Sequence, residues 1–248
     1  MRVIQVENYE KMSKLAAKII SSQIILNPKI KIGLATGSTP VGLYEELIKL
    51  YKEKEISFSE VLTFNLDEYY PLKNSHKSSY HVFMEENLFK HVDIKISNTH
   101  IPNGEAENPF EEALRYEKAI EAVGGIDLQL LGIGVNGHIG FNEPSDYFEK
   151  ETHLVDLSKA TLNSNAKYFD DRDSMPTKAI SVGIGTIMKS KKILLLASGA
   201  SKSEIVERMI YGKVSPKVPA SILQFHNDIT VIVDNEAGKG LKLHDKNA

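Results

Sequence analysis

The sequence contains no cysteine, which excludes disulfide bonds, thiolate zinc sites and cysteine nucleophiles together. It also lacks an excess of positive charge, because the formal net charge is −3 at pH 7, and this gives no basic surface for nucleic acid as the main partner. No apolar run approaches the length of a membrane span, and residues 1–7 read as a strand rather than as a signal peptide. These absences predict a cytoplasmic protein with neither a membrane nor nucleic acid as its partner.

What is present is the composition of an average globular protein, with 42% hydrophobic and 25% charged residues among 248. Short apolar runs alternate along the chain with segments of helical spacing. The expected strands span 30–35, 61–66, 126–133, 193–197 and 229–233. The expected helices span 9–23, 41–53, 79–89, 109–122 and 203–211. The sequence therefore predicts an α/β fold: a Rossmann-like, doubly wound, mostly parallel sheet with helices on both faces, in a single domain that spans 1–248.

In open α/β sheets, ligands bind beyond the carboxyl ends of the strands, so functional residues are expected in the loops after the predicted strands. The loop 35–40 follows a strand and opens a helix, with Gly37 in a tight turn and Thr39 as the expected helix cap. Backbone amides at such a helix start, together with the hydroxyls of Ser38 and Thr39, are suited to a phosphate group. The alternative is an ordinary strand-to-helix turn. The loop has neither the Walker nor the dinucleotide spacing, which argues against a nucleotide.

A second loop of this kind spans 198–202, between another strand and helix. Lys202 lies at its end and can supply a positive charge to the same anion. The alternative is a solvated surface lysine; the position of Gly199 at a sheet end favours the binding role.

Two adjacent carboxylates, Asp67 and Glu68, follow the strand 61–66. A carboxylate at a strand end can act as a base toward a carbon-bound proton once water is excluded. The alternative is that Asp67 caps a turn and Glu68 is solvated. If both point inward, repulsion between like charges favours protonation of one of them.

The densest group of polar and glycine residues lies in 131–144, after the central strand. Glycines let the backbone approach a ligand and bring His138 to the strand end. Glu143 can hydrogen-bond one imidazole nitrogen and so fix the tautomer, and Asn136 can hold either partner or a substrate hydroxyl. A metal site is the weaker interpretation, because no third ligand lies at useful spacing.

The run 134–144 resembles the signature of the glucosamine-6-phosphate deaminase family. Further matching segments are 34–40, 65–69, 101–104, 182–186 and 198–202. The resemblance implies conversion of an amino-sugar phosphate, glucosamine 6-phosphate, with water into fructose 6-phosphate and ammonia, without an organic cofactor or a metal. It implies that Asp67 moves a proton between C2 and C1 through an enolamine. It also implies that His138, held by Glu143 and Asn136, assists ring opening.

The same resemblance implies a phosphate site on the amides of Gly37, Ser38 and Thr39, with Lys202 and Lys167 as the cations. Many relatives carry arginine at the position of Lys167, and lysine keeps the charge but loses the bidentate geometry. Many also carry aspartate at the position of Asn136, so control of the His138 charge would depend more on Glu143. Hexamers and smaller forms both occur in the family, so a homo-oligomer is one assembly that the resemblance allows.

Three other functions are alternatives to the deaminase. The first is 6-phosphogluconolactonase, which shares the fold but usually follows the histidine with a different run from residues 140–144. The second is a simple sugar-phosphate isomerase, since the chemistry is closely related. The third is a sugar-phosphate-sensing regulator, which would need an added DNA-binding module. The polar segment 147–173 is expected to form a lid over the site.

Overall fold

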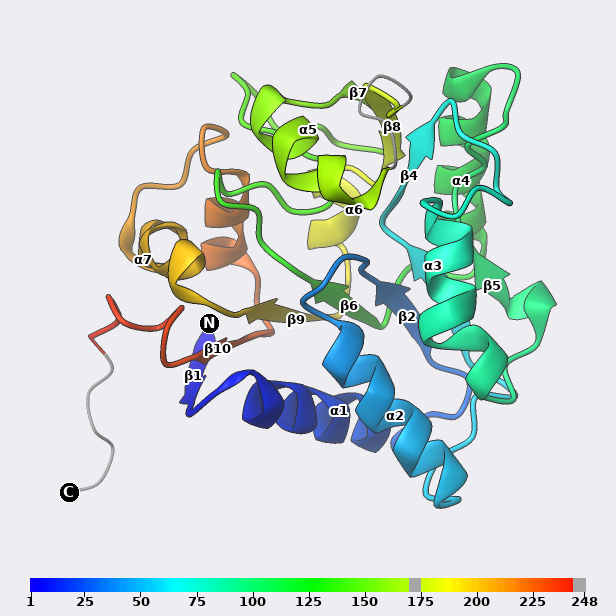
Figure 1. Ribbon diagram of the computed structural model, residues 1–248, viewed down its shortest axis with the longest axis horizontal. Helices are drawn as coiled ribbons and strands as arrows, with labels where there is room; N and C mark the ends of the chain where they lie inside the picture. The colour runs from blue at the N-terminus through cyan, green and yellow to red at the C-terminus, as the bar shows by residue number, and fades with distance from the viewer. Residues whose placement is uncertain (170–174, 243–248) are drawn as a thin grey trace.

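The computed structural model describes residues 1–169 and 175–242, and its centre is a sheet of seven strands (Figure 1). The strands are β1 (Arg2–Val6), β2 (Lys31–Leu34), β3 (Leu62–Asn65), β5 (Thr99–His100), β6 (Leu128–Leu131), β9 (Lys192–Ala197) and β10 (Ile229–Asp234). Their order is β1-β10-β9-β6-β2-β3-β5, and every neighbouring pair is parallel. The predicted mostly parallel sheet is thereby confirmed.

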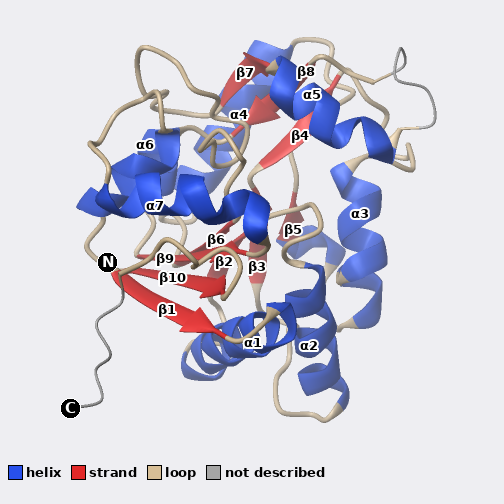
Figure 2. Ribbon diagram, turned by 60° about the vertical axis from the view of Figure 1, so that its left-hand side comes forward, coloured by secondary structure: helices blue, strands red, loops and turns tan. Residues whose placement is uncertain are grey.

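Helices cover both faces of this sheet, as the alternating sequence pattern predicts. They are α1 (Tyr9–Leu26), α2 (Val41–Lys52), α3 (Tyr80–Asn87), α4 (Pro109–Ala122), α5 (Lys159–Asn165), α6 (Ile184–Met188) and α7 (Ser203–Tyr211). Short 3-10 helices are η1 (Phe89–His91), η2 (Ile96–Asn98), η3 (Ala166–Tyr168), η5 (Ala200–Lys202) and η6 (Pro219–Phe225). Figure 2 shows α1 and α2 on one face of the sheet and α6 and α7 on the other. No described helix is long and apolar enough to cross a membrane.

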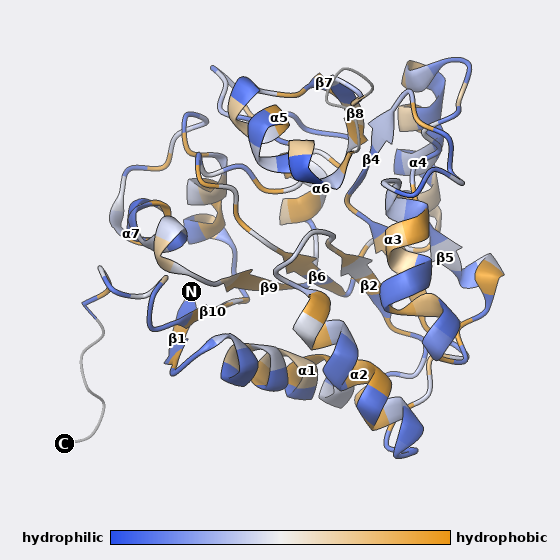
Figure 3. Cartoon of the chain, in the orientation of Figure 1, coloured by the Kyte–Doolittle hydropathy of each residue, from blue (hydrophilic) through white to orange (hydrophobic). Residues whose placement is uncertain are grey.

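The hydrophobic core lies between the sheet and these helix layers. Figure 3 shows apolar residues along β6 and β9, whereas the helices carry both apolar and polar residues. Residues 193–197 of β9 are at most 2% exposed, which is expected for a central strand covered on both faces. Burial of such runs fixes the strands in place, and so it fixes the loops at their carboxyl ends.

The chain also forms a second sheet, which the sequence pattern did not predict. Strands β4 (Asp67–Tyr70), β8 (Lys178–Ser181) and β7 (His153–Asp156) pair antiparallel in the order β4-β8-β7. Asp67 therefore begins a strand instead of lying in a loop. The polar residues of β4 do not form an apolar run, and the strand exists because it pairs with β8, more than 100 positions further along the chain.

One residue, Leu66, connects the two sheets. Its backbone N–H donates to Leu34 O of β2 at 3.1 Å, and its carbonyl accepts from Val182 N, just after β8, at 2.8 Å. The chain thus passes from the large sheet to the small one immediately before Asp67, through a residue whose N–H and carbonyl are both hydrogen-bonded.

The start of α2 differs from the prediction that Thr39 caps it. Pro40 occupies the cap position, and no side chain of the helix start makes a capping hydrogen bond. Instead, the hydroxyl of Tyr9, at the start of α1, accepts from Gly42 N at 2.8 Å. The same hydroxyl lies 3.1 Å from the carbonyls of Ser38 and Thr39. The prediction failed because the cap comes from a distant helix, which local sequence rules do not detect.

Candidate active site

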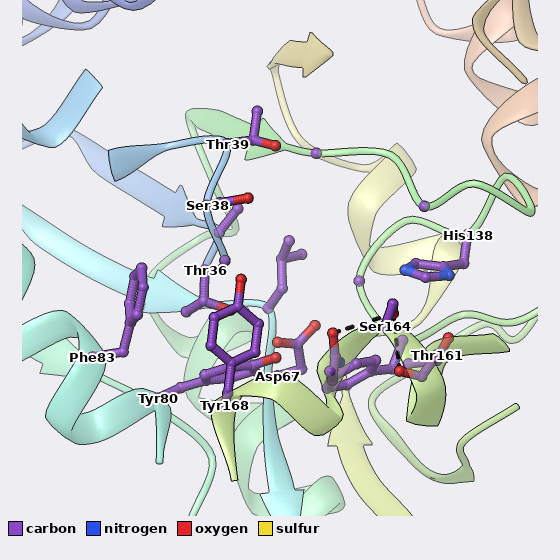
Figure 4. A pocket seen from close by; sticks show the side chains of 18 of the residues that line it. Thr36, Ser38, Thr39, Asp67, Tyr80, Phe83, His138, Thr161, Ser164 and Tyr168 are labelled. Carbon is purple, nitrogen blue, oxygen red and sulfur yellow. Dashed lines mark hydrogen bonds between the residues drawn. The ribbon is translucent and has the colours of Figure 1, made fainter. Parts of the chain in front are cut away.

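A cavity of about 620 Å³ lies beyond the carboxyl ends of the central strands (Figure 4). It brings together eight of the predicted site residues, which come from separate segments of the chain. These are Gly37, Ser38, Thr39, Asp67, Asn136, His138, Lys167 and Lys202. The ninth, Glu143, does not line the cavity but contacts Asn136 and His138 from behind. The expectation that ligand-binding groups collect at this edge of the sheet therefore agrees with the geometry.

The Asp67 carboxylate faces this cavity in surroundings that do not stabilise its charged form. The residue is 6% exposed, and no described residue donates a hydrogen bond to its side chain. Burial, and then the neighbouring negative charge of Glu68, raise its pKa from 3.8 to about 8. Gly140 passes close by, since a Cβ at that position would lie 3.5 Å from Asp67 Oδ2. A buried acid with a pKa near neutrality is suited to accept and return a proton.

Glu68, the adjacent acid, has a different environment. It is fully buried, and its oxygens accept from the backbone N–H groups of Tyr69 (2.9 Å), Tyr80 (2.8 Å) and His81 (3.2 Å). The alternative of a solvated Glu68 is therefore wrong. Antiparallel pairing with β8 turns this side chain inward, and the sequence pattern alone did not indicate that pairing.

His138 is held by an indirect network. Its Nδ1 lies 2.8 Å from Asn136 Oδ1, and Asn136 Nδ2 donates to Glu143 Oε2 at 2.7 Å. Glu143 Oε2 itself is 3.6 Å from His138 Nδ1, so the predicted direct hydrogen bond is replaced by one through Asn136. Because Asn136 Oδ1 is an acceptor, this network assigns the proton to Nδ1 and leaves Nε2 free to accept one.

Two further features hold this network in place. Burial opposes ionisation of Glu143, but His138, the hydroxyl of Thr161 and the amide of Asn136 together lower its pKa to about 2. Gly134 lies against the imidazole ring, because a Cβ there would come within 2.2 Å of His138 Cε1. A glycine is required at this position because the ring occupies the space of a side chain.

The loops around the cavity also supply groups that suit an anion. Gly37 and Gly199 adopt φ values of 87° and 90°, which favour glycine, and no described atom lies within 4 Å of where a Cβ would be at either. Lys202 Nζ donates to Ile133 O at 2.6 Å. Burial, and then the charge of Lys167, lower the pKa of Lys202. The two lysines therefore lie close enough to repel each other, and an anion between them would relieve that repulsion.

Some cavity residues were not found from the sequence. Tyr80 and Phe83 come from α3, and their spacing of three on a helix places them on one face. Such spacing indicates a helix but does not show that this face of the helix lines a cavity. Thr161 and Ser164 of α5 also line the cavity, and Figure 4 shows them near His138.

The predicted lid, 147–173, is described only up to residue 169; its part from 170 onward lies outside the described residues. Within it, Asn165 Nδ2 donates to Tyr69 OH at 2.9 Å, and the Tyr168 carbonyl accepts from Ser78 Oγ at 2.6 Å. Asn165, Lys167 and Tyr168 line the cavity. Among the described residues, no group of three or more His, Asp and Glu side chains is arranged to hold a metal ion.

Fold and cavity together are those of an α/β enzyme, with its candidate active site beyond the carboxyl ends of parallel strands. The chain belongs to the family of glucosamine-6-phosphate isomerases and 6-phosphogluconolactonases, whose family model matches residues 5–232. It is 56% identical over 243 residues to a glucosamine-6-phosphate deaminase of Clostridium botulinum, covering 98% of this chain and 100% of that one. The resemblance inferred from the motifs is thereby confirmed.

Two more relatives support this placement. The glucosamine-6-phosphate deaminase of Clostridioides difficile is 54% identical over 245 residues, covering 99% of this chain and 98% of that one. A solved structure of a monomeric glucosamine-6-phosphate deaminase has a TM-score of 0.94 at 46% identity and covers 96% of this chain and 99% of that one. A 6-phosphogluconolactonase from Trypanosoma cruzi, with a TM-score of 0.77 at 21% identity, covers 98% of this chain and 97% of that one and shows a shared fold alone.

Proposed function

We propose that this enzyme is a glucosamine-6-phosphate deaminase, which converts glucosamine 6-phosphate and water into fructose 6-phosphate and ammonia. Relatives that carry this name match nearly the whole chain at 54–56% identity. The observation that carries the proposal is the pairing of two proton-transfer groups in one cavity. Asp67 has a pKa of about 8 and no hydrogen-bond donor among the described residues, and His138 is oriented by Asn136.

In this proposal, Asp67 acts at carbon. In the open-chain sugar, its carboxylate removes the proton from C2 and returns it to C1, so that the enolamine becomes a ketimine at C2. Water then adds to the C2=N bond, and ammonia leaves to give the ketose. A base that holds the proton between the two steps needs a pKa near neutrality, which burial gives to Asp67.

His138 acts at oxygen in the same proposal. Ring opening requires a proton to leave the hydroxyl on C1 and one to reach the ring oxygen. The free Nε2 of His138 can accept and return such a proton, while Asn136 and Glu143 keep Nδ1 oriented. His138 therefore acts on oxygen during ring opening, whereas Asp67 acts on carbon in the later step.

The phosphate group would lie at the end of the cavity lined by Gly37, Ser38 and Thr39, between Lys167 and Lys202. Backbone amides at the start of α2 and two cations suit a doubly charged phosphate. Binding there would draw Lys202 from its contact with Ile133 O toward the ligand. Because the phosphate is remote from C1 and C2, its contacts would hold the substrate in register with Asp67.

The test is a parallel assay of ammonia and fructose 6-phosphate from purified protein given glucosamine 6-phosphate, with a metal chelator present. Equal amounts of both products support the proposal. Hydrolysis of 6-phosphogluconolactone without ammonia release would show that the enzyme is a lactonase and not a deaminase. Interconversion of neutral sugar phosphates alone would replace it by an isomerase.

The proposal extends to compartment and assembly. We place the enzyme in the cytoplasm, because a phosphorylated sugar is charged and is retained there. The similar solved deaminase is described as monomeric, and we propose a monomer of one domain spanning 1–248 for this chain as well. Light scattering on the purified protein tests this, and a larger mass would favour the homo-oligomer that the resemblance allows.

A further inference from the structure

Asp67 and Glu68 are neighbours in β4, yet their side chains have opposite surroundings. Side chains alternate along a strand, so the two carboxylates leave β4 on opposite faces. The Asp67 carboxylate faces the active cavity and receives no hydrogen bond from a described residue. The Glu68 carboxylate does not line that cavity, is fully buried, and collects several donors. Such a difference is how proteins give two adjacent acids separate roles.

The donors to Glu68 come mainly from the start of α3. Oε2 accepts from Tyr80 N at 2.8 Å and His81 N at 3.2 Å, and lies 3.0 Å from His81 Nδ1. Oε1 accepts from Tyr69 N at 2.9 Å. The first N–H groups of a helix lack partners within it, and the helix dipole favours a negative charge there. Glu68 supplies both the hydrogen-bond acceptors and the negative charge to the start of α3. Both oxygens serve as acceptors, which is the arrangement of an ionised carboxylate.

Helix α3 in turn forms a wall of the active cavity. Tyr80 and Phe83 line that cavity, and Figure 4 shows Tyr80 beside Asp67, with Phe83 further away on the other side of Tyr80. The other side of the helix, with His81 and Glu85, lines a second cavity of about 480 Å³. The position of α3 therefore sets the shape of the active cavity, and Glu68 connects α3 to the strand that begins with Asp67.

We propose that Glu68 is a positioning residue for the reaction: it fastens α3 to β4 and places a fixed negative charge beside the Asp67 base. This inference rests on the proposed function, in which Asp67 moves the proton between C2 and C1. The fixed charge disfavours ionisation of Asp67 and so makes its carboxylate a stronger base once the proton is lost. It acts on Asp67 together with burial, which is the larger cause.

Other titratable groups surround the two carboxylates. They are Tyr69 of β4, Tyr80 and His81 of α3, and Tyr116 of α4. Burial raises the pKa of each tyrosine above its ordinary value, so none of them ionises near neutral pH. The remaining group, His81, has a side chain that is 30% exposed. The variant His81→Gln measures what this side chain contributes to the activity.

The test compares Glu68→Gln with wild type in the ammonia assay across pH. The glutamine keeps the shape but removes the charge and brings an NH₂ group against N–H donors of α3. We expect kcat to fall about tenfold through misplacement of the base, with KM within about twofold because Glu68 does not line the cavity. The ascending limb of kcat/KM against pH should move about one pH unit toward acid.

Glu117→Gln is the matched control. Glu117 is 3% exposed and accepts from Thr152 N and from the hydroxyls of Thr152 and Thr186, but it does not line the active cavity. Its loss should lower stability and leave the pH limb unchanged. An unshifted limb in Glu68→Gln, with or without loss of activity, would make that residue merely structural and overturn the inference.

Two further measurements complete the test: a second variant and wild type in parallel. If Glu68→Gln does not fold, His81→Gln takes its place, since it leaves the backbone donors to Glu68 intact. It should lower kcat severalfold with KM unchanged, and unaltered kcat would overturn the inference. Wild type is measured in parallel: no ammonia from wild type rejects the proposed function itself, whereas an active wild type with an unaltered variant rejects only the role of Glu68.

Discussion

Replacing Asp67 by asparagine should stabilise the protein while it stops the reaction. The carboxyl is buried, and its pKa is about 8 in the folded protein against an ordinary value of 3.8. This difference corresponds to about 6 kcal/mol, since each pKa unit is worth about 1.36 kcal/mol. The folded protein therefore keeps a proton that the unfolded chain has already released.

The pH dependence follows from that proton. Below about pH 4 both states are protonated, and Asp67 contributes no difference in stability. As the pH rises toward about 8, the unfolded chain binds fewer protons than the folded one, so wild type loses stability steadily. Above that range the loss is complete and stays constant. Asp67→Asn removes the ionisable group, so its advantage over wild type should grow across this range and then level off.

The expected gain is smaller than the full value, because the new amide lacks partners at this site. An unsatisfied buried polar group costs about 1–3 kcal/mol, which leaves a gain of about 3–5 kcal/mol near pH 8.5. For a chain of this size, that raises the melting temperature by on the order of 10 °C. Turnover of glucosamine 6-phosphate should fall by at least a factor of about 100, the usual contribution of a general base.

Thermal unfolding at about pH 5 and pH 8.5 measures this effect, with Asp127→Asn as the control. Asp127 lies 2.8 Å from Lys191 Nζ and 3.4 Å from Lys31 Nζ. Burial raises its pKa, but the hydrogen bonds and charges of these lysines outweigh burial and lower it overall. Its contribution is therefore present above the unfolded pKa, and Asp127→Asn should destabilise the protein at both pH values. If Asp67→Asn melts no higher than wild type at pH 8.5, or gains as much at pH 5, the reasoning about the buried proton is wrong.

Three other substitutions test the remaining parts of the site. His138→Gln should reduce kcat less than Asp67→Asn does, because some substrate opens its ring unaided; an equal loss in steady-state kinetics would contradict the ring-opening role. Lys202→Ala should raise KM about 10- to 100-fold by removing a charge-assisted contact, with kcat little changed, and an unaltered KM would count against a phosphate role. Gly134→Ala should displace the imidazole, since its Cβ would lie 2.2 Å from His138 Cε1. We expect a loss similar to that of His138→Gln, and full activity would show that the ring can shift without harm.

The parts of this molecule that sequence predicted are those with local signals. Apolar runs such as 193–197 identify buried parallel strands, and the segments that follow such strands bring Asp67, His138 and Lys202 to one cavity. What sequence missed depends on contacts between distant segments. The hydroxyl of Tyr9 replaces the predicted cap of α2, and β4 is a strand only because β8 pairs with it. No local pattern distinguishes a tyrosine or a polar tetrapeptide with such a role from a solvated one.

The junction at Leu66 has a consequence for redesign of this enzyme. Its backbone N–H donates to Leu34 and its carbonyl accepts from Val182, so neither sheet can be shifted without moving Asp67, which follows it. Loops at the far ends of the strands can be lengthened or exchanged with those of relatives, because such grafts leave this junction intact. A single inserted residue at Leu66 would instead shift the register of β4 by one, so that Asp67 takes the position of Glu68 on the face away from the cavity. Chimeras of related chains should therefore be cut in the outer loops and never between β3 and β4.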